Sequence, residues 1–356
     1  MKLLVISSAP VVEIDGKSHL YAPYEKEMQL WAKHADEIQF CCPVWREDKK
    51  LLIAPISFKV DGIVELQEFD ITSFFNKLKA IPFAFVALVK TYRAMKQADH
   101  IHLRCPGNIA LLACLVQVLF PNKKKTAKYA GNWDPNSQQP WSYRLQKWIL
   151  SNTFLTRNMQ VLVYGEWEGS SKNIKPFFTA TYSESEIQNS EFRIQNELSL
   201  RAHSKTTVNN FDSAQSNKEF NSLLSLRPKS RTNETLIHFL FVGTLSPGKQ
   251  PLYAIQLVEA LYRQGKNVLL DLYGEGVLRT DLERYIAENK LETLIVLKGN
   301  QTKETLLKAY QSHHFLILPS KSEGWPKVVA EAMFWGCLPI VTKVSCIPYM
   351  LDYGKD

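Results

Sequence analysis

The sequence has 356 residues, of which 45% are hydrophobic and 22% are charged, and it carries a formal net charge of +8. This composition is typical of a globular protein, and at about 100–200 residues per domain the length predicts two domains. The longest apolar stretches, Ile81–Val89 and Ile109–Phe120, are shorter than the ~18 residues of a membrane-spanning helix, which argues against an integral membrane protein. The apolar run Met1–Ser7 lacks the length and the cleavage pattern of a signal peptide, so we expect a cytoplasmic protein.

The positive charge and the cysteines narrow the possible partners only in part. A basic chain attracts anions, which include nucleic acid, anionic membranes and phosphorylated small molecules. The six cysteines form no Cys-x-x-Cys pair, and no histidine cluster lies near them at the spacing of zinc ligands. We therefore expect no metal site, and buried thiols in a reducing compartment.

Short apolar runs alternate with amphipathic stretches along the chain. The runs are apolar on both faces, as strands of a buried parallel sheet must be, and helical patterns separate most of them. This alternation predicts an α/β fold with parallel sheets. The predicted strands are Leu3–Ser7, Ile38–Cys42, His100–Leu103, Thr126–Ala130, Val161–Tyr164, Ile237–Val242, Val268–Tyr273, Leu294–Leu297, Phe315–Leu318 and Leu338–Val341.

The composition changes between Tyr182 and Thr235, where polar residues replace the apolar periodicity. We interpret this segment as a peripheral excursion followed by an interdomain linker. The expected domains are residues 1–205 and 235–356, joined by a linker at 206–234.

Proline and glycine mark the ends of one helix clearly. Apolar residues recur at helical spacing from Pro251 until Gly265, which predicts a helix between them. In the first half, Ala9–His19 is expected to be a loop that leads to a helix from about Tyr24 to His34.

The stretch that begins with the strand Phe315–Leu318 carries the strongest indication of function. A polar loop with Glu323 follows this strand, and a helix starts near Pro326. Ligands of open α/β sheets bind outside the carboxyl ends of the strands, and helix amino termini favour phosphate or sugar oxygens. Glu331 follows Glu323 by eight residues (331 − 323 = 8), or about two helical turns, so both carboxylates can accept hydrogen bonds from one ligand's hydroxyl groups.

This stretch resembles the signature of the retaining glycosyltransferases of family 4, which have the GT-B fold. The resemblance rests on the Glu-x7-Glu spacing, on the Ser-Glu-Gly around Glu323, and on the run from Glu331 through Pro339. It implies two Rossmann-like domains whose parallel sheets face each other across a cleft. It also implies that Glu331 binds the ribose of a nucleotide-sugar donor and that Glu323 contacts the transferred sugar. The intervening donor-binding residues are implied to be Gly324, Trp325, Pro326, Lys327 and Val328.

A second part of the implied donor site follows the predicted strand Ile237–Val242. A small-residue turn begins with Gly243 and Thr244, and Lys249 lies at the mouth of the next helix, where an ammonium group can meet a diphosphate. The resemblance assigns Lys249 to the donor pyrophosphate. Most family members have an arginine where this chain has Thr244, which weakens this part of the phosphate site.

Gly274 and Glu275 match the family's Gly-x-Gly segment, which lies beside the nucleotide. A dinucleotide-binding fingerprint would need a further glycine at position 279, which is Arg279, so NAD is not supported and no cofactor is expected. The resemblance implies transfer of a glycosyl group with anomeric retention and without a metal, in surface polysaccharide or glycoconjugate synthesis. The nucleotide diphosphate is the leaving group, stabilised by Lys249 and helix amino termini.

The first half resembles the family more loosely. Where family members often have a histidine, this chain has Asn132 and Asp134, which we predict as catalytic candidates. Arg104 and Asn108 end a strand and are predicted on the acceptor side. For Arg104, a structural ion pair is the alternative.

Aromatic and basic residues together suit an anionic membrane surface, and we predict peripheral contact with the inner face of the membrane and a lipid-linked saccharide acceptor. A solvated helix face above an ordinary core is the alternative. The residues concerned are Phe74–Lys79, Ile81–Val89, Lys90, Arg93, Lys96, Lys123–Lys125 and Lys128.

Three other functions stay open from the sequence. A nucleotide-sugar epimerase of the same architecture would need no acceptor, and a non-catalytic sugar-nucleotide-binding scaffold would fit Thr244. Nucleic-acid binding is suggested only by the charge, because no known nucleic-acid-binding motif is present, and we do not expect it. The family normally continues beyond the position of Asp356 with a strand and helices, so we expect that the C-terminal end of the fold is missing.

Overall fold

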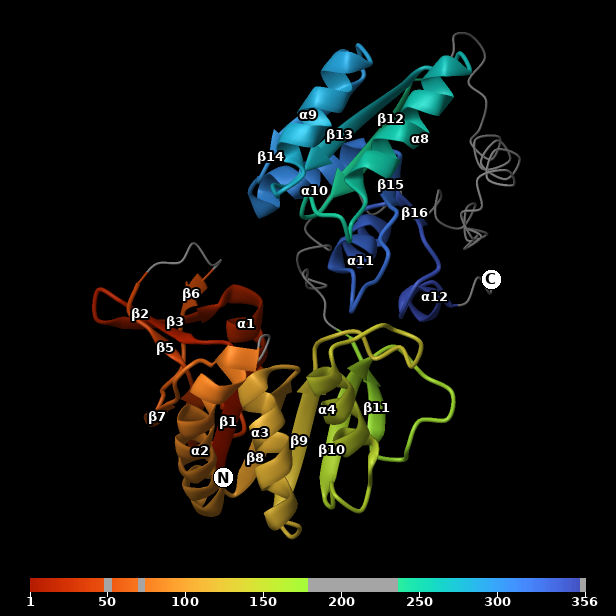
Figure 1. The fold of residues 1–356 in the computed structure, drawn as a ribbon. Coiled ribbons are helices and arrows are strands. Elements are labelled where there is room, and N and C mark those ends of the chain that lie inside the picture. The colour runs from red at the N-terminus through yellow and green to blue at the C-terminus, as the bar shows by residue number, and fades with distance from the viewer. Residues whose placement is uncertain (48–52, 70–73, 179–235, 353–356) are drawn as a thin grey trace. The chain divides into compact units, whose positions relative to one another are not determined.

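The computed structural model describes residues 1–47, 53–69, 74–178 and 236–352 (Figure 1). The chain divides into two compact units, Met1–Phe178 and Thr179–Asp356, which we call unit 1 and unit 2. Each unit has its own parallel sheet with helices packed against it, so the prediction of an α/β fold with parallel sheets is confirmed. The linker predicted at residues 206–234 lies outside the described residues.

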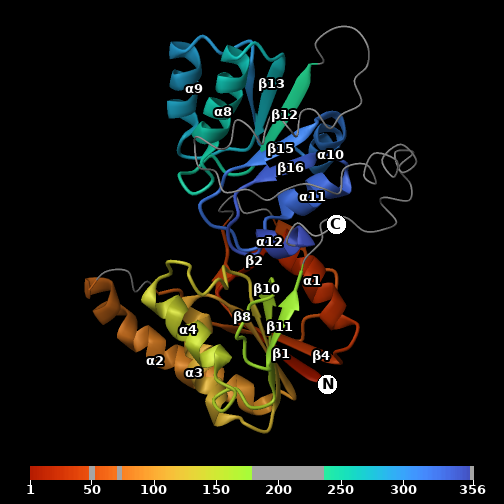
Figure 2. The same ribbon diagram turned by 90° about the vertical axis from the view of Figure 1, so that its right-hand side faces the viewer.

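Unit 1 is built on a seven-stranded parallel sheet with the order β11-β10-β9-β8-β1-β4-β7. Helix α1 covers one face of this sheet, and α2, α3 and α4 cover the other (Figure 2). The strands are β1 (Lys2–Ser7), β4 (Glu37–Cys42), β7 (Gly62–Glu65), β8 (His100–Cys105), β9 (Lys124–Tyr129), β10 (Met159–Tyr164) and β11 (Ile174–Phe177). The helices are α1 (Ala22–Ala32), α2 (Phe74–Gln97), α3 (Asn108–Val116), the 3-10 turn η1 (Gln117–Leu119) and α4 (Trp141–Ser151).

The central strand β1 shows why this sheet is buried on both faces. Leu3 and Val5 pack against α1, while Leu4 and Ile6 point the other way into the core beneath α2 and α3. Alternate side chains of a strand point to opposite faces, so a strand covered on both sides must be apolar throughout. This is the pattern from which the sequence predicted the strands.

The prediction of a loop at Ala9–His19 is wrong. The segment forms a β-hairpin of β2 (Val11–Ile14) and β3 (Lys17–Tyr21), which belongs to a small four-stranded sheet with the order β5-β2-β3-β6. Asp15 and Gly16 at its tip have φ of 49° and 71°, as a tight hairpin turn requires. The remaining strands are β5 (Val44–Trp45) and β6 (Ile53–Pro55).

Unit 2 is built on a five-stranded parallel sheet with the order β14-β13-β12-β15-β16. Helices α8 and α9 lie on one side of the sheet, and α10 and α11 on the other (Figure 2). The strands are β12 (Ile237–Val242), β13 (Val268–Tyr273), β14 (Ile295–Gly299), β15 (Phe315–Leu318) and β16 (Leu338–Val341). The helices are α8 (Pro251–Arg263), α9 (Arg279–Glu288), α10 (Lys303–Ser312), α11 (Lys327–Phe334) and the short α12 (Ile347–Met350).

The strand order of unit 2 reverses between β12 and β15. From β12 the chain adds β13 and β14 on one side, and then returns to add β15 and β16 on the other. Such a reversal separates the loops that leave the two central strands, and ligands of open α/β sheets bind at this point. The loops after β12 and β15 are those that contain Lys249 and Glu323.

Candidate functional site

Hydrogen bonds to backbone carbonyls bring the loops after β12, β15 and β16 together at the carboxyl edge of the unit 2 sheet. The amide of Lys321 donates to the carbonyl of Gly248 at 2.9 Å, which joins the first two loops. The hydroxyl of Thr342 donates to the carbonyl of Ser320 at 2.6 Å, which joins the second loop to the third. These bonds fix the positions of side chains that are far apart in the sequence.

Lys249 and Glu323 form a direct ion pair at this edge. The Lys249 Nζ atom lies 2.6 Å from Oε1 and 2.8 Å from Oε2 of Glu323, whose side chain is only 6% exposed. The Lys249 side chain is 28% exposed, so the ammonium group still reaches solvent. The amide of Glu323 donates to Ser345 Oγ at 3.2 Å and so orients the loop. The structure thus brings together the two residues that the sequence predicted as the centre of the donor site.

Two helices begin beside this ion pair. Gln250, with φ of 51°, directly precedes α8, whose first residue is Pro251. Helix α11 begins at Lys327 after Pro326, and the Cys346 thiol donates to the carbonyl of Gly324 at 2.7 Å. The first amides of a helix have no intrahelical partner and carry partial positive charge, so both helix starts favour a bound anion.

Glu331 lies on α11 and is held by Tyr310 of α10. The Tyr310 hydroxyl donates to Glu331 Oε2 at 2.9 Å, and Tyr310 is fully buried. The other carboxylate oxygen, Oε1, has no hydrogen-bond partner in the part of the chain that the structure describes. Glu331 therefore keeps one oriented acceptor for a ligand hydroxyl, as its predicted role requires. The sequence analysis missed Tyr310, because a tyrosine within an amphipathic helix is indistinguishable from an ordinary core residue.

Gly274 and Gly276 allow the loops after β12 and β13 to touch. A Cβ atom on Gly274, whose φ is +138°, would lie 2.0 Å from the carbonyl oxygen of Gly243. A Cβ atom on Gly276 would lie 2.5 Å from the carbonyl oxygen of Leu245. The Gly-x-Gly segment is thus required for loop packing, whatever the segment binds.

The other predicted donor residues lie around the same edge. Glu275 forms an ion pair with Arg279 of α9, and Thr244 is exposed after β12. From Gly324 to Val328 in the first turn of α11, the residues are half-buried, except that Pro326 is buried. The half-buried residues are Gly324, Trp325, Lys327 and Val328.

In unit 1, Arg104 lies in an ion-paired cluster at the carboxyl ends of β8 and β9. Its Nη1 atom lies 2.6 Å from Glu27 Oε2, and Lys128 Nζ lies 2.8 Å from the same oxygen. The guanidinium group stacks on the Tyr24 ring, 3.7 Å from its centroid. Burial raises the pKa of Glu27, but the charges of Arg104 and Lys128 outweigh this effect and hold the pKa below its usual value.

Two lysines that the sequence suggested for a membrane surface are buried instead. Lys128 is 3% exposed and contacts Glu27, and Lys125 is 2% exposed and donates to the carbonyls of Gln117 and Phe120. Burial lowers the pKa of Lys125 to about 8. This part of the predicted membrane surface is therefore wrong: burying an ammonium group is costly, and these two have found partners inside unit 1.

Asn132 and Asp134 close the turn after β9. Asn132 Oδ1 accepts from the amide of Asp134 at 2.9 Å, and Asp134 Oδ1 accepts from the amide of Asn136 at 2.8 Å. Such side-chain bonds to the backbone two residues later stabilise turns. Asn108 makes a different contact, because its Nδ2 atom donates to the distant carbonyl of Phe69 at 2.9 Å. The predicted roles of these three residues stay predictions.

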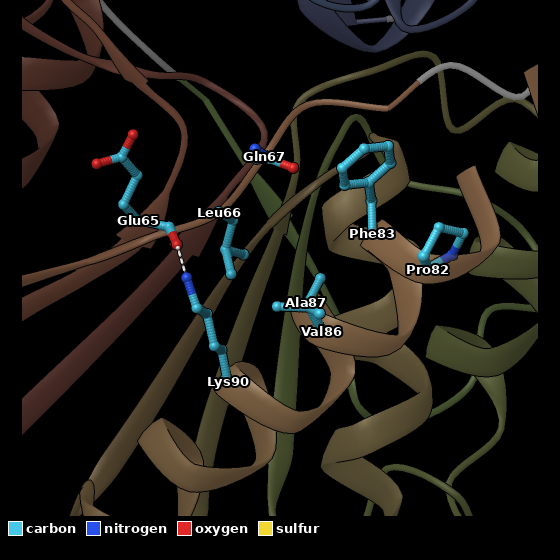
Figure 3. A pocket seen from close by; sticks show the side chains of 8 residues that line it. All are labelled: Glu65, Leu66, Gln67, Pro82, Phe83, Val86, Ala87 and Lys90. Carbon is cyan, nitrogen blue, oxygen red and sulfur yellow. Dashed lines mark hydrogen bonds between the residues drawn. The ribbon is translucent and has the colours of Figure 1, made fainter. Parts of the chain in front are cut away.

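A cavity of about 420 Å³ opens between the end of β7 and α2 (Figure 3). The Lys90 ammonium donates to the carbonyl of Glu65 at 2.8 Å, while the Glu65 carboxylate turns away from the cavity and pairs with Arg46. The lining is mainly apolar and consists of Glu65, Leu66, Gln67, Pro82, Phe83, Val86, Ala87 and Lys90.

All six cysteines are buried, as predicted. Within the described ranges, no group of three or more His, Cys, Asp or Glu side chains is arranged to hold a metal ion. The helices that the structure describes include none that is both long and apolar enough to cross a bilayer.

The C-terminal part of the chain matches a known protein family. Residues 224–356 match the family model described as Glycosyl transferases group 1. Alpha-D-kanosaminyltransferase of Streptomyces kanamyceticus is 28% identical over 94 residues, which are 26% of this chain and 24% of that protein. The chain therefore spans about a quarter of the length of this curated relative.

Solved structures resemble the chain over nearly its whole length. The lipopolysaccharide outer core galactosyltransferase WaaB, in its apo form, has a TM-score of 0.58 at 15% identity, and the match covers 98% of this chain and 83% of that one. Alr3699/HepE of Anabaena, in complex with UDP and glucose, has a TM-score of 0.56 at 13% identity, with 98% and 83% covered. WaaG, a glycosyltransferase involved in lipopolysaccharide biosynthesis, has a TM-score of 0.54 at 10% identity, with 98% and 84% covered. Residues 224–356 therefore carry a Glycosyl transferases group 1 domain, and the chain has the fold of the GT-B glycosyltransferases.

Proposed function

We propose that the chain is a retaining glycosyltransferase of family 4, which moves a sugar from a nucleotide-diphosphate sugar to a saccharide or lipid-linked saccharide. The observation that carries this proposal is the ion pair of Lys249 and Glu323 at the switch point of the unit 2 sheet. A cation suited to a diphosphate and a carboxylate suited to sugar hydroxyls lie together there, inside the group 1 domain.

Lys249 stabilises the leaving group in the proposed reaction. An ammonium group has three donors, and Glu323 occupies two of them at most, so one remains for the donor diphosphate. The bond between the anomeric carbon and the diphosphate oxygen breaks, and its electron pair stays on the diphosphate. The acceptor hydroxyl bonds to the anomeric carbon from the same face, and its proton passes to the departing diphosphate. The charge of Lys249 and the starts of α8 and α11 favour this build-up of negative charge, so we propose that no metal is needed.

Glu331 and Glu323 orient the two ends of the donor. The Oε1 atom of Glu331 accepts a hydrogen bond from the ribose, while Tyr310 holds the other oxygen in place. Glu323 accepts from a hydroxyl of the transferred sugar. In unit 1, Asn132 and Asp134 remain our predicted catalytic residues, and Asn108 remains a predicted acceptor-side residue.

The proposal includes a peripheral location at the cytoplasmic face of a membrane, where the acceptor is lipid-linked. Exposed apolar side chains gather on the three helices that cover one face of the unit 1 sheet and on the turn η1, and helix α2 has five basic residues and no acidic one. Aromatic and basic groups together favour an anionic bilayer surface. The cavity between β7 and α2, at the carboxyl edge of the sheet, fits an apolar part of the acceptor. The exposed side chains are Phe83, Phe85, Val86, Tyr92, Leu115, Leu119, Trp141 and Trp148.

Thermal unfolding of the chain with a panel of UDP-, GDP- and ADP-sugars tests the donor site. A ligand that binds only the folded state stabilises it by about 2.7 kcal/mol at a hundredfold excess over Kd. We expect a shift with the sugars of one nucleotide, and no shift for the Glu331→Ala variant. No shift with any of them would contradict the proposal.

Product analysis then separates transfer from the alternatives. A glycosyltransferase forms a new glycoside only when an acceptor is present. A nucleotide-sugar epimerase would release a free epimerised sugar without one, and a scaffold would bind the nucleotide sugar and leave it intact.

A further inference from the structure

Three charged side chains of unit 1 meet where β8 and β9 end. Arg104 of β8 is the register partner of Lys128 of β9, so the two side chains lie beside each other on the face that α1 covers. Glu27 of α1 accepts from both through a single oxygen, Oε2. The side chains of Glu27, Arg104 and Lys128 are 13%, 15% and 4% exposed, so the cluster is nearly enclosed.

Arg104 contacts both Glu27 and Tyr24, yet most of its donors are not used. A guanidinium group has five N–H donors. Among the described residues, Arg104 donates only to Glu27, and only through Nη1. None of its nitrogen atoms is both buried and without a partner, so the unused donors face solvent. The Tyr24 ring, whose centroid lies 3.7 Å from the guanidinium carbon, covers one side of the group.

The charge of the cluster favours a second anion. Two cations share one carboxylate oxygen, and the three side chains together carry a charge of +1 (2 − 1 = +1). His102 adds no charge near neutral pH, because burial lowers its pKa to about 3. A planar guanidinium fork matches the two oxygens of a carboxylate or a phosphate. The cluster also lies at the carboxyl edge of a parallel sheet, where ligands of this architecture bind.

We propose that Arg104 binds an oxyanion of the acceptor, a phosphate or a carboxylate, so that the preferred acceptor is an anionic saccharide. Glu27 accepts from the guanidinium group on one side, and the acceptor oxyanion accepts hydrogen bonds from the N–H groups on the other. This inference rests on the proposed glycosyltransferase function, because that function provides the acceptor.

Titration of three probes with the full chain tests the inference, and ligand-observed NMR measures how tightly each probe binds. The probes are glucose, glucuronate and glucose 6-phosphate. We expect both anionic probes to bind about 10- to 100-fold more tightly than glucose, as charge-assisted hydrogen bonds imply. Arg104→Gln should abolish this preference. Lys249→Ala should keep it, because the donor-site cation lies in unit 2 and serves a different phosphate.

A second variant separates anion binding from a purely structural ion pair. Glu27→Gln removes the carboxylate that competes for Arg104, so binding of both anionic probes should become several-fold tighter. Unchanged or weaker binding would mean that the cluster only joins α1 to the sheet, and would overturn the inference. This readout stands even if Arg104→Gln fails to fold.

The remaining outcomes are also decisive. If the anionic probes still bind Arg104→Gln more tightly than glucose does, the anion binds at a site other than Arg104. The same holds if Lys249→Ala loses this preference, and either result overturns the inference. A preference for one anionic probe alone supports it and identifies the oxyanion as carboxylate or phosphate. If nucleotide sugars give no thermal shift while the Arg104-dependent preference persists, the proposed function fails and the anion site stands.

Discussion

The ammonium group of Lys249 lies 2.6 and 2.8 Å from the two carboxylate oxygens of Glu323, although the residues are 74 positions apart. The pair exists because β12 and β15 are neighbours in the sheet and because the Lys321 amide bonds the Gly248 carbonyl. The two loops are thus joined through their backbones, and the side chains are held in place before any ligand binds. Preorganised charges of this kind are effective in catalysis, since they need no rearrangement during the reaction.

Removal of either partner of this ion pair should impair transfer and stability together. We expect Lys249→Ala to lower kcat by about 10²- to 10³-fold, the range seen when one stabilising donor is lost. The variant also leaves the nearly buried Glu323 carboxylate without its cation, which should lower the free energy of unfolding by about 1–3 kcal/mol. Steady-state kinetics and urea denaturation measure the two effects.

A double-mutant cycle and a matched lysine complete this test. The Lys249→Ala/Glu323→Ala protein should be less destabilised than the sum of the single variants, because neither charge is left alone. Lys308→Ala, at an exposed position of α10, should change neither kcat nor stability measurably. Additive effects in the cycle would contradict direct coupling of Lys249 and Glu323.

Tyr310→Phe should weaken the nucleotide site without removing the carboxylate. The hydroxyl that orients Glu331 is lost while the buried ring remains. We expect a Kd for the nucleotide sugar about three- to tenfold higher, which corresponds to one neutral hydrogen bond of about 1 kcal/mol. Glu331→Ala should reduce binding further. Isothermal titration of both variants measures their affinities for the nucleotide sugar and shows which is weaker. Equal affinity of Tyr310→Phe and the unchanged chain would refute the orienting role.

The strands of unit 2 were predictable because their pattern is local. Phe315–Leu318 is apolar at every position and is buried at every position, so the prediction and the strand agree residue by residue. Ile237–Val242 and Val268–Tyr273 also have the predicted bounds, although each contains one polar residue and two half-buried positions. In the hairpin at Val11–Tyr21, the Asp15-Gly16 turn between alternating residues is also a local signal, and it went unused.

Contacts between distant segments were not predictable. The Glu-x7-Glu spacing pointed to Glu323, and the turn after β12 pointed to Lys249, but nothing in either segment implies that they touch. Lys128 is the opposite case, because it looked like a surface charge until Glu27 from α1 was placed beside it. A single sequence gives the chemistry of each loop, whereas the strand order decides which loops meet.

Gly274→Ala should be severely destabilising, because two costs coincide. The new methyl group would lie 2.0 Å from the carbonyl oxygen of Gly243, and the φ of +138° is strained for any other residue. We expect a loss of at least about 3 kcal/mol in the free energy of unfolding, measured by urea denaturation. Gly248→Ala is the matched control: no atom lies within 4 Å of its added Cβ, and we expect a change below about 0.5 kcal/mol. Similar stability of the two variants would show that the loops after β12 and β13 do not pack this closely.

The exposed aromatic residues of unit 1 predict binding to anionic vesicles. Phe85 and Trp148 are 67% and 60% exposed, and the Phe85→Ser/Trp148→Ser protein should bind vesicles with anionic lipid about tenfold more weakly. Tyr262→Ser, which alters a 55% exposed aromatic residue of unit 2, should bind like the unchanged chain. Liposome flotation at two salt concentrations measures this, since attraction to anionic lipid weakens as salt is added. Flotation that depends on neither anionic lipid nor salt would contradict the proposed peripheral location at the membrane.

The cluster around Glu27 predicts how stability depends on pH. The pKa of Glu27 lies below its usual value in the folded state, so the unfolded chain binds the proton more readily. The stabilisation is then fully present above the unfolded pKa of about 4.3, and it is lost as the pH falls through the lower folded pKa. Glu27→Gln should therefore lower the free energy of unfolding by about 3 kcal/mol between pH 5 and pH 7, the cost of removing one partner of a buried pair.

Below about pH 4.3 the difference in unfolding free energy between the Glu27→Gln variant and the unchanged chain should shrink, because the unfolded state of the unchanged chain takes up its proton on Glu27 before the folded state does. Urea denaturation from pH 7 down to pH 3.5 follows this decrease, and His102 is neutral over most of the range because burial lowers its pKa to about 3. Glu37→Gln is the control, since its ion pair with Lys2 is exposed and should contribute little at any pH. A difference between Glu27→Gln and the unchanged chain that stayed constant down to pH 3.5 would mean that Arg104 and Lys128 lower the pKa of Glu27 well below that value. A difference that grew as the pH fell would contradict an ionised Glu27 between the two cations.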